Sequence, residues 1–229
     1  MIIHSLDKVF KDTIRELNDK EREKHVSSGK LSASRLGWAL QWQVLHLMGI
    51  ETPEVDDYVL CLFARGKDVE EKVIDILKMK LRITDVQKEV EYKNTVGVVD
   101  FIFKDEPYEV KSVKNSKFKR IETQGDADPQ VILQACFYAM AMKAPRFHIV
   151  YVSADDYRIE HFVKETADYS ESVDKVIREA SEAFQTGIVP EFEPRYKWQK
   201  NAKYASYPDY INLTSKEATL KAKEKDERL

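Results

Sequence analysis

The stretch VGVVDFIFKDEPYEVKSVK, residues 96–114, places two carboxylates and a lysine inside segments that otherwise have the composition of buried strands. The segments TVGVVDFIF (95–103) and PYEVKSV (107–113) are rich in β-branched and aromatic residues, and the polar KDE between them predicts a hairpin turn. Burying a charge in a sheet is unfavourable unless the charge is paired or binds a metal. These charged residues therefore need a compensating partner.

Three of the charged residues are expected to meet on one face of this hairpin. Side chains alternate along a strand, so Glu109 and Lys111 share a face, and Asp100 reaches the same face if the two strands pair. Carboxylates that converge raise one another's pKa, and a divalent cation between them relieves the repulsion. Because oxygen ligands favour Mg²⁺ or Mn²⁺ over zinc, the pattern predicts a metal site suited to hydrolysis of a phosphodiester bond.

Outward from the hairpin, helix and strand signals alternate along the chain. We expect helices at 5–25, 31–49, 64–80, 128–143 and 168–187, and further strands at 81–94, 146–153 and 157–165. Ser32 and Ser34 are candidate caps of the second helix, Asp128 and Pro129 mark the start of the fourth, and residues 216–229 are expected to fray. The order predicts an α/β fold with a central mixed sheet flanked by helices and an N-terminal helical elaboration.

Length and composition limit the class of protein. The chain has 229 residues, enough for one large core, and we divide it into an N-terminal elaboration (1–60), a core (61–190) and a C-terminal irregular segment with a charged tail (191–229). Its only two cysteines, Cys61 and Cys136, lie far apart and exclude a CxxC zinc site. No signal-peptide or membrane-spanning run is visible, which predicts a cytoplasmic, soluble protein without a membrane partner.

The spacing of Asp100, Glu109 and Lys111, D-x8-E-x-K, resembles the signature of the PD-(D/E)XK nuclease superfamily. The resemblance implies a restriction-endonuclease-like fold and a metal-dependent nuclease activity. It also implies one or two Mg²⁺ or Mn²⁺ ions, with the backbone carbonyl of Val110 as a further ligand. The alternative interpretation is that the same residues are gatekeeper charges, which keep an exposed edge strand from pairing with another chain.

Further motifs resemble the RecB-like branch of this superfamily. Glu70, four residues after Gly66, resembles the residue that completes the metal site in that branch, although a solvated helix glutamate would look the same. QACFY, with Gln134 and Tyr138, matches the Q-x-x-x-Y element, and Gln130 extends the same polar stripe by one helical turn. A structural glutamine–tyrosine pair is the alternative interpretation of this stripe.

Ser34 and Arg35 in SASRL resemble the serine–arginine entry to the N-terminal helix of the same branch, where a helix N-terminus could bind a phosphate. A simple helix cap explains them equally well. Many relatives also carry four cysteines that hold an iron–sulfur cluster. The corresponding segment here, EPRYKWQKNAKYASYPDY (193–210), has no cysteine, so we expect no cluster and a segment that is held by packing or is mobile.

Two basic segments could contact nucleic acid despite the net charge of −3. KSVKNSKFKR (111–120) begins at Lys111, the lysine of the D-x8-E-x-K signature. It carries Lys114 and Lys117, which are placed to contact a DNA backbone. Segment 193–210 interleaves basic residues with tryptophan and tyrosine, a composition typical of single-strand grooves and also of ordinary surface loops.

The sequence thus predicts a metal-dependent deoxyribonuclease, most readily an exonuclease that acts on single-stranded DNA or on a free DNA end. In this hypothesis the metal ligands are Glu70, Asp100, Glu109 and the Val110 carbonyl, Lys111 acts on the attacking water or the phosphate, and Gln134 and Tyr138 position the strand. The resemblance implies a 5′-phosphate product. No Walker motif is present, so ATP-driven unwinding would come from a partner helicase or recombination protein.

Three alternatives stay open at this point. The first is an endonuclease of the same fold, either site-specific or structure-specific. The second is a subunit that binds DNA ends without cleaving them, and the third is a structural protein in which the charged residues form an internal salt-bridge network.

Overall fold

The computed structural model describes residues 5–24, 29–201 and 205–226, with only the backbone described for 20–24. The helices are α1 (Leu6–Lys24), α2 (Leu40–Leu47), α3 (Asp57–Lys78), α4 (Asn115–Gln124), α5 (Pro129–Met142), α6 (Ser170–Thr186) and α7 (Ser215–Asp226). The strands are β1 (Leu31–Ser32), β2 (Asp85–Tyr92), β3 (Thr95–Phe103), β4 (Glu106–Val113), β5 (Arg146–Ser153) and β6 (Ile159–Glu165). None of the described helices is long and apolar enough to cross a bilayer.

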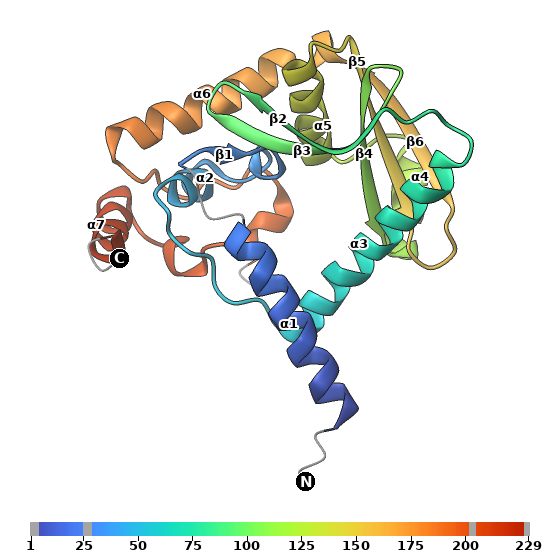
Figure 1. The fold of residues 1–229 in the computed structure, drawn as a ribbon. Helices are drawn as coiled ribbons and strands as arrows, with labels where there is room; N and C mark the ends of the chain where they lie inside the picture. Colours follow the sequence, from blue (N-terminus) through green and yellow to red (C-terminus); the bar gives the residue numbers. More distant parts are fainter. Residues whose placement is uncertain (1–4, 25–28, 202–204, 227–229) are drawn as a thin grey trace.

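The strands form one mixed sheet in the order β1-β3-β4-β5-β6, and β2 pairs with the other edge of β3 (Figure 1). β3 is antiparallel to β2 and β4, β4 is parallel to β5, and β6 returns antiparallel to β5. The hairpin turns at Lys104 and Asp105, whose φ values of 54° and 62° are those of a two-residue type I′ turn. This is the central mixed sheet flanked by helices that the sequence predicts.

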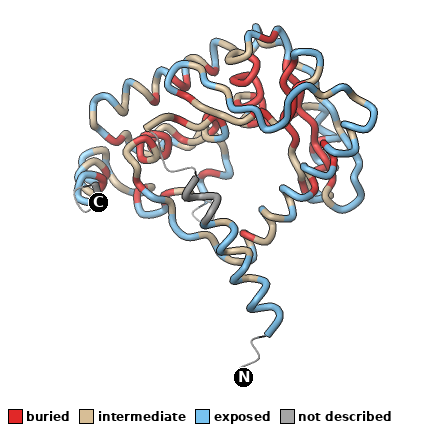
Figure 2. Tube along the Cα trace, viewed as in Figure 1, coloured by how far each residue is buried: buried red, intermediate tan, exposed pale blue. Residues whose placement is uncertain are grey.

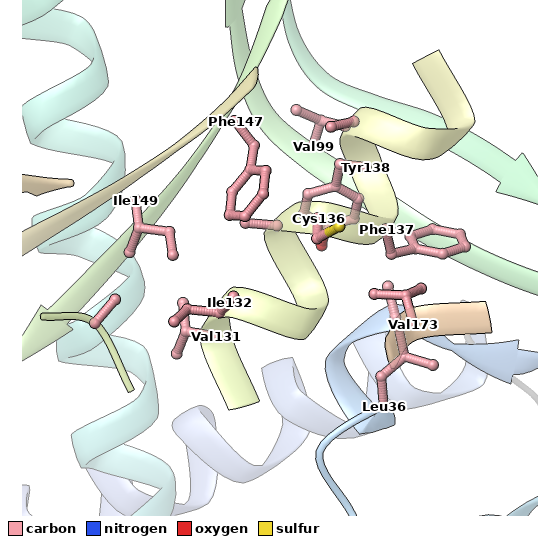
Figure 3. Packing of buried hydrophobic residues seen from close by; sticks show 14 of the residues in the cluster. Leu36, Val99, Val131, Ile132, Cys136, Phe137, Tyr138, Phe147, Ile149 and Val173 are labelled. Atoms are coloured by element: carbon pink, nitrogen blue, oxygen red, sulfur yellow. The ribbon is translucent and has the colours of Figure 1, made fainter. Parts of the chain in front are cut away.

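Helix α5 lies in the main core, where its buried side chains pack with residues of β5 (Figure 3). Its buried residues Val131, Ile132 and Phe137 belong to one cluster with Phe147 and Ile149 of β5. The nearly continuous apolar sequence of α5 follows from this burial, because the helix packs against the sheet on one side and α6 on another.

Helix α3 covers the opposite face of the sheet. Val69, Val73 and Ile74 of α3 pack with Val110 of β4 and Val150 of β5 in a separate apolar cluster. β4 is therefore enclosed between two helices, and its polar residues lie inside the protein rather than on an exposed edge. Figure 2 shows the resulting run of buried residues along the central strands.

A third apolar cluster joins segments from both halves of the chain, around α2 (Figure 2). Trp42 of α2 packs with Tyr207, Tyr210 and Ala218. The Tyr207 hydroxyl donates a hydrogen bond of 2.9 Å to the carbonyl of Ile50. The described part of the segment after residue 190 is held by packing of this kind.

Segment 31–49 is not the single helix that the sequence predicts. Leu31 and Ser32 instead form β1, parallel to the start of β3, a 3₁₀ turn follows at 33–35, and α2 begins only at Leu40. The serine hydroxyls of Ser32 and Ser34 lie 2.9 Å apart and cap no helix. Tertiary pairing with β3 here outweighs local helix propensity.

Two other local predictions are wrong, and one helix was not expected from the sequence. Residues 216–226 are helical rather than frayed, because Ala218 and Ala222 are buried one turn apart in the third cluster. α4 was not predicted, although Phe118 and Ile121 give it a buried face. Asp128 precedes α5 without capping it by a side-chain hydrogen bond, because its carboxylate forms salt bridges with α4.

Candidate active site

The site lies where the two strands of the hairpin separate. β3 and β4 pair only near their turn, from Phe103 opposite Glu106 to Phe101 opposite Tyr108. β1 pairs with the first residues of β3 on the same edge, and β2 occupies the other edge along its length. Among the described strands, the middle of this edge of β3 has no partner, and the ladder stops one pair before Asp100.

Two carboxylates accept hydrogen bonds from the backbone amides of β4 that face this gap. Asp100 Oδ2 accepts from the amide of Val110 at 2.7 Å, and Glu70 Oε1 from α3 accepts from the amide of Ser112 at 2.8 Å. The N–H and C=O groups of one strand residue point to the same edge, so the Val110 carbonyl also faces the gap. Two of the predicted ligand side chains and the predicted backbone ligand therefore line one short stretch of β4.

Glu109 and Lys111 form an ion pair on the α5 side of β4, as their alternation predicts. Glu109 is only 1% exposed, and neither of its carboxylate oxygens accepts a hydrogen bond of ordinary geometry from the described residues. Burial raises the pKa of Glu109 to about 8 against the effect of the Lys111 ammonium, and the charge of Asp100 adds to the increase. Glu109 is thus a buried carboxylate whose ion pair does not offset the cost of burying its charge.

The Lys111 ammonium lowers the pKa of three carboxylates, those of Glu70, Asp100 and Glu109, against the effect of burial. Burial disfavours its charged form, but the charges of Glu109 and Asp100 outweigh this effect and raise the Lys111 pKa. Burial also raises the pKa of Asp100 and that of Glu70, although each accepts a backbone hydrogen bond. The site therefore has more negative than positive charge and favours an additional cation.

Tyr138 connects α5 to this cluster. Its hydroxyl accepts a hydrogen bond of 2.8 Å from Gln134 Nε2, and its side chain is 2% exposed. Burial and the nearby charge of Glu109 raise the pKa of Tyr138, so the side chain stays a neutral phenol. The ring approaches β3 closely because position 97 is glycine: a Cβ on Gly97 would lie 2.6 Å from the ring.

A cavity of about 300 Å³ opens beside Lys111. Its polar lining comes from four elements and consists of Ser34, Lys111, Ser112, Lys117, Gln130 and Gln134. Its aromatic lining consists of Trp38, Tyr151 and Trp198. The structure thus brings Lys111, the two glutamines of the polar stripe and Lys117 of the first basic segment to a common cavity.

Three of the predicted binding residues, Tyr138, Arg35 and Lys114, lie outside this lining. The Arg35 guanidinium contacts the His46 ring and lies 4.9 Å from the centre of the Trp38 ring, so it packs against a residue of the cavity wall. Lys114 is exposed at the start of α4. Lys117 lines the cavity and forms a salt bridge of 2.8 Å with Asp128.

The carboxylates of Glu70, Asp100 and Glu109 are ligands of the type that a divalent cation binds. Within residues 5–24, 29–201 and 205–226, no three His, Cys, Asp or Glu side chains converge closely enough to hold a metal ion as they stand. The buried carboxylate of Glu109 nevertheless accepts no hydrogen bond of ordinary geometry from the described residues, and the charges of Asp100 and Glu70 raise its pKa. Hard oxygen ligands with excess negative charge fit Mg²⁺ or Mn²⁺.

Several residues of the site were not identified from the sequence. Gln87 Nε2 donates a hydrogen bond of 3.2 Å to Asp100, and nothing in its local sequence indicates this contact. Trp38 lies in a segment that was predicted as a regular helix. Trp198 belongs to the aromatic and basic segment that the sequence singled out, but its position beside Lys111 is a tertiary relationship.

No protein-family model and no curated protein sequence matches the chain. Solved structures, in contrast, do match the chain in fold. An alkaline exonuclease (LHK-Exo) from Laribacter hongkongensis superposes with a TM-score of 0.55 at 17% identity, covering 78% of this chain and 96% of the exonuclease. The same exonuclease in complex with dAMP gives a TM-score of 0.55 at 14% identity, covering 72% of this chain and 95% of that one.

A third structure, SSO0001, superposes with a TM-score of 0.51 at 17% identity and covers 88% of this chain and 96% of its own. At these identities the similarity concerns the fold. This chain therefore has the restriction-endonuclease-like α/β fold that these exonucleases share.

Proposed function

We propose that this chain is a metal-dependent deoxyribonuclease of the PD-(D/E)XK type, most similar to the RecB-like branch, and that it acts as an exonuclease. One observation carries the proposal: buried Glu109 forms an ion pair with half-buried Lys111, which lines the cavity, and the charges of Asp100 and Glu70 act on the same pair. Gatekeeper charges on an exposed edge strand would leave Glu109 in solvent, whereas it is 1% exposed. The fold shared with exonucleases supports the same assignment.

Glu70, Asp100, Glu109 and the Val110 carbonyl would hold the Mg²⁺ or Mn²⁺ ion. When bound, the ion would activate water and stabilise negative charge on a phosphoryl oxygen. Lys111 stays protonated because of its carboxylate neighbours, so its ammonium can orient water or donate to a non-bridging phosphate oxygen at the cavity wall. The resemblance to the superfamily supports release of the 3′ oxygen and a 5′-phosphate product.

Tyr138 and Gln134 would hold the site in shape and position the strand. The Tyr138 hydroxyl is buried between Gln134 and Glu109, and Gln134 also lines the cavity. A glutamine that is 9% exposed can donate to a phosphate oxygen at low entropic cost, because its side chain is already ordered. Gln130 and Ser34 line the same cavity and are placed for a similar role.

The experiment that tests the proposal is cleavage of end-labelled linear and covalently closed circular DNA, single- and double-stranded, with Mg²⁺, Mn²⁺ or EDTA. Wild type is compared with Lys111→Ala and with Lys216→Ala, which removes an exposed lysine of α7. We expect metal-dependent loss of linear DNA that Lys111→Ala abolishes and Lys216→Ala retains. Nicked circles would indicate the endonuclease alternative, and binding without cleavage under every metal would indicate an end-binding subunit.

A partner helicase or recombination protein stays a prediction from the sequence. If such a partner exists, it would supply unpaired strands to the cavity. Pull-down of the chain with and without a single-stranded oligonucleotide would check it.

A further inference from the structure

The cavity beside Lys111 has an aromatic wall that the proposed cleavage chemistry does not require. We propose that this cavity takes the unpaired terminal nucleotide of a DNA strand, with its base stacked on Trp198 and with Trp38 closing the same wall. This inference rests on the proposed function and adds the form of substrate: a single-stranded end whose last base is read by stacking.

Trp198 has the exposure expected of a binding platform. It is 38% exposed, while Trp42 is completely buried. The ring of Trp198 lies 6.2 Å from that of Trp42 at a tilt of 53°, so one side rests on the third apolar cluster and the remaining surface lines the cavity. Stacking a base there would remove apolar ring surface from water without moving the core.

Trp38 is fixed more firmly and completes the wall. Its ring meets the edge of Trp42 at 6.2 Å, and the Arg35 guanidinium lies 4.9 Å from its centre. These contacts hold the ring in one orientation. We therefore assign Trp38 to the shape of the cavity and Trp198 to the stacking contact.

The platform is held in place before any ligand arrives. Gln199, next to Trp198, is fully buried. Its Nε2 donates a hydrogen bond of 2.9 Å to the carbonyl of Gly37, and its Oε1 accepts one of 2.7 Å from the amide of Arg195. A single side chain thus ties the C-terminal segment to the loop that carries Trp38. A rigid wall of this kind reduces the entropic cost of binding.

The size and charge of the cavity define the ligand. About 300 Å³ is at the lower end of the range for small-ligand sites, which accommodates one nucleotide and excludes a base pair. Lys111 and Lys117 supply positive charge in the same cavity, and Ser34 and Gln130 supply polar groups. A phosphate near Lys111 and a base against Trp198 therefore describe one terminal nucleotide, separated from its complementary strand.

The test removes the terminal base from the oligonucleotide and the Trp198 ring from the protein, separately and together. Fluorescence anisotropy in EDTA measures binding of single-stranded oligodeoxynucleotides that are intact, or that carry an abasic nucleotide at the 5′ or the 3′ end. The proteins are wild type, Trp198→Ala, Trp198→Phe and Phe63→Ala, which removes an exposed aromatic ring of α3 outside the cavity lining. Thermal unfolding monitored by circular dichroism confirms that each variant is folded.

We expect loss of the base at one end to weaken wild-type binding about tenfold, the size typical of one stacked base. Trp198→Ala should weaken binding of the intact oligonucleotide by a similar factor and show no further loss with the abasic end, because the two changes remove the same contact. Trp198→Phe and Phe63→Ala should keep the wild-type dependence on the base. The end at which the base matters also gives the polarity of entry.

Equal penalties for the abasic end in wild type and Trp198→Ala would overturn the inference, as would a blunt duplex that binds as tightly as an unpaired end. That result would leave the proposed function intact if Lys111→Ala still abolished metal-dependent cleavage. Absence of cleavage by wild type under every metal, with base-dependent binding retained, would instead overturn the nuclease and keep the terminal-nucleotide site.

Discussion

The carboxylate of Asp100 accepts a hydrogen bond of 2.7 Å from the backbone amide of Val110, at the point where β3 and β4 stop pairing. The side chain here replaces the backbone carbonyl that an intact ladder would offer. Asp100 thus satisfies β4 and brings a carboxylate toward Glu109 and Lys111. One residue serves both the strand and the site.

Substitutions of Asp100 should separate these two roles. In Asp100→Asn the amide oxygen can still accept from Val110, so we expect the free energy of unfolding to change by no more than about 1 kcal/mol while cleavage falls about a hundredfold or more. Asp100→Ala leaves the Val110 amide without its partner and should cost about 1–3 kcal/mol in addition. Urea unfolding and single-turnover cleavage measure the two effects. Equal stability of both variants would contradict the role in the strand.

The stability of the metal-free protein should depend on pH through Glu109. Because its pKa is raised to about 8 in the folded state, the folded protein binds more protons than the unfolded chain between about pH 4.5 and 8. Stability in EDTA should therefore fall as pH rises through this window, and Glu109→Gln should remove a slope of about 1 kcal/mol per pH unit. Urea unfolding at pH 5, 6, 7 and 8 measures the difference between wild type and the variant.

Saturating Mg²⁺ provides the matching test of metal binding. An ion held by the ionised Glu109 favours the deprotonated folded state and should flatten the same pH dependence in wild type. Glu109→Gln should respond much less to the ion. An identical response of both proteins to Mg²⁺ would argue against Glu109 as a ligand.

Tyr138→Phe should affect activity more than stability. The substitution keeps the buried ring and removes only the hydroxyl between Gln134 and Glu109. We expect about a tenfold loss of cleavage rate and a destabilisation of about 1 kcal/mol. Phe137→Leu is the matched control, since it changes a neighbouring buried ring of α5 without removing a polar group. A larger loss of rate in the control would assign Tyr138 to packing alone.

Gly97→Ala tests the close approach of α5 to β3. A Cβ at this position would lie 2.6 Å from the Tyr138 ring and 2.7 Å from the Cβ of Ala33, and neither neighbour can move freely. We expect a destabilisation of about 1–3 kcal/mol. Gly66→Ala is the control, because its Cβ would meet open space within α3 and should stabilise the helix by up to about 1 kcal/mol. Thermal unfolding ranks the two variants against wild type.

The sequence predicts the hairpin and its charged face because both follow from local alternation. Glu109 and Lys111 meet as expected, and Glu70 reaches β4 from the helix face that also carries Ile74. The prediction of a helix at 31–49 fails because the structure there depends on a distant partner: β1 forms by pairing with β3. No local sequence pattern at residues 31–32 indicates that pairing with β3 is more favourable than a helix.

One missed element had a local signal. Thr214 and Glu217 form a reciprocal capping box, in which Glu217 Oε2 accepts from the Thr214 amide at 2.9 Å and the Glu217 amide donates to Thr214 Oγ1 at 3.4 Å. The T-x-x-E spacing was readable and would have predicted α7. By contrast, the position of Trp198 beside Lys111 depends on Gln199 reaching Gly37 across 162 residues, which no local pattern encodes.

The hydrogen bond between Gln199 and Gly37 joins two parts of the chain that are synthesised 162 residues apart. The sheet that carries Asp100, Glu109 and Lys111 is complete in a nascent chain that has reached β6, but the wall formed by Trp198 is not. A ribosome-bound or proteolytically shortened chain that stops before residue 198 would keep the charged cluster and lose the nucleotide platform. Synthesis of the chain therefore completes the strands of the sheet before it completes the wall of this cavity.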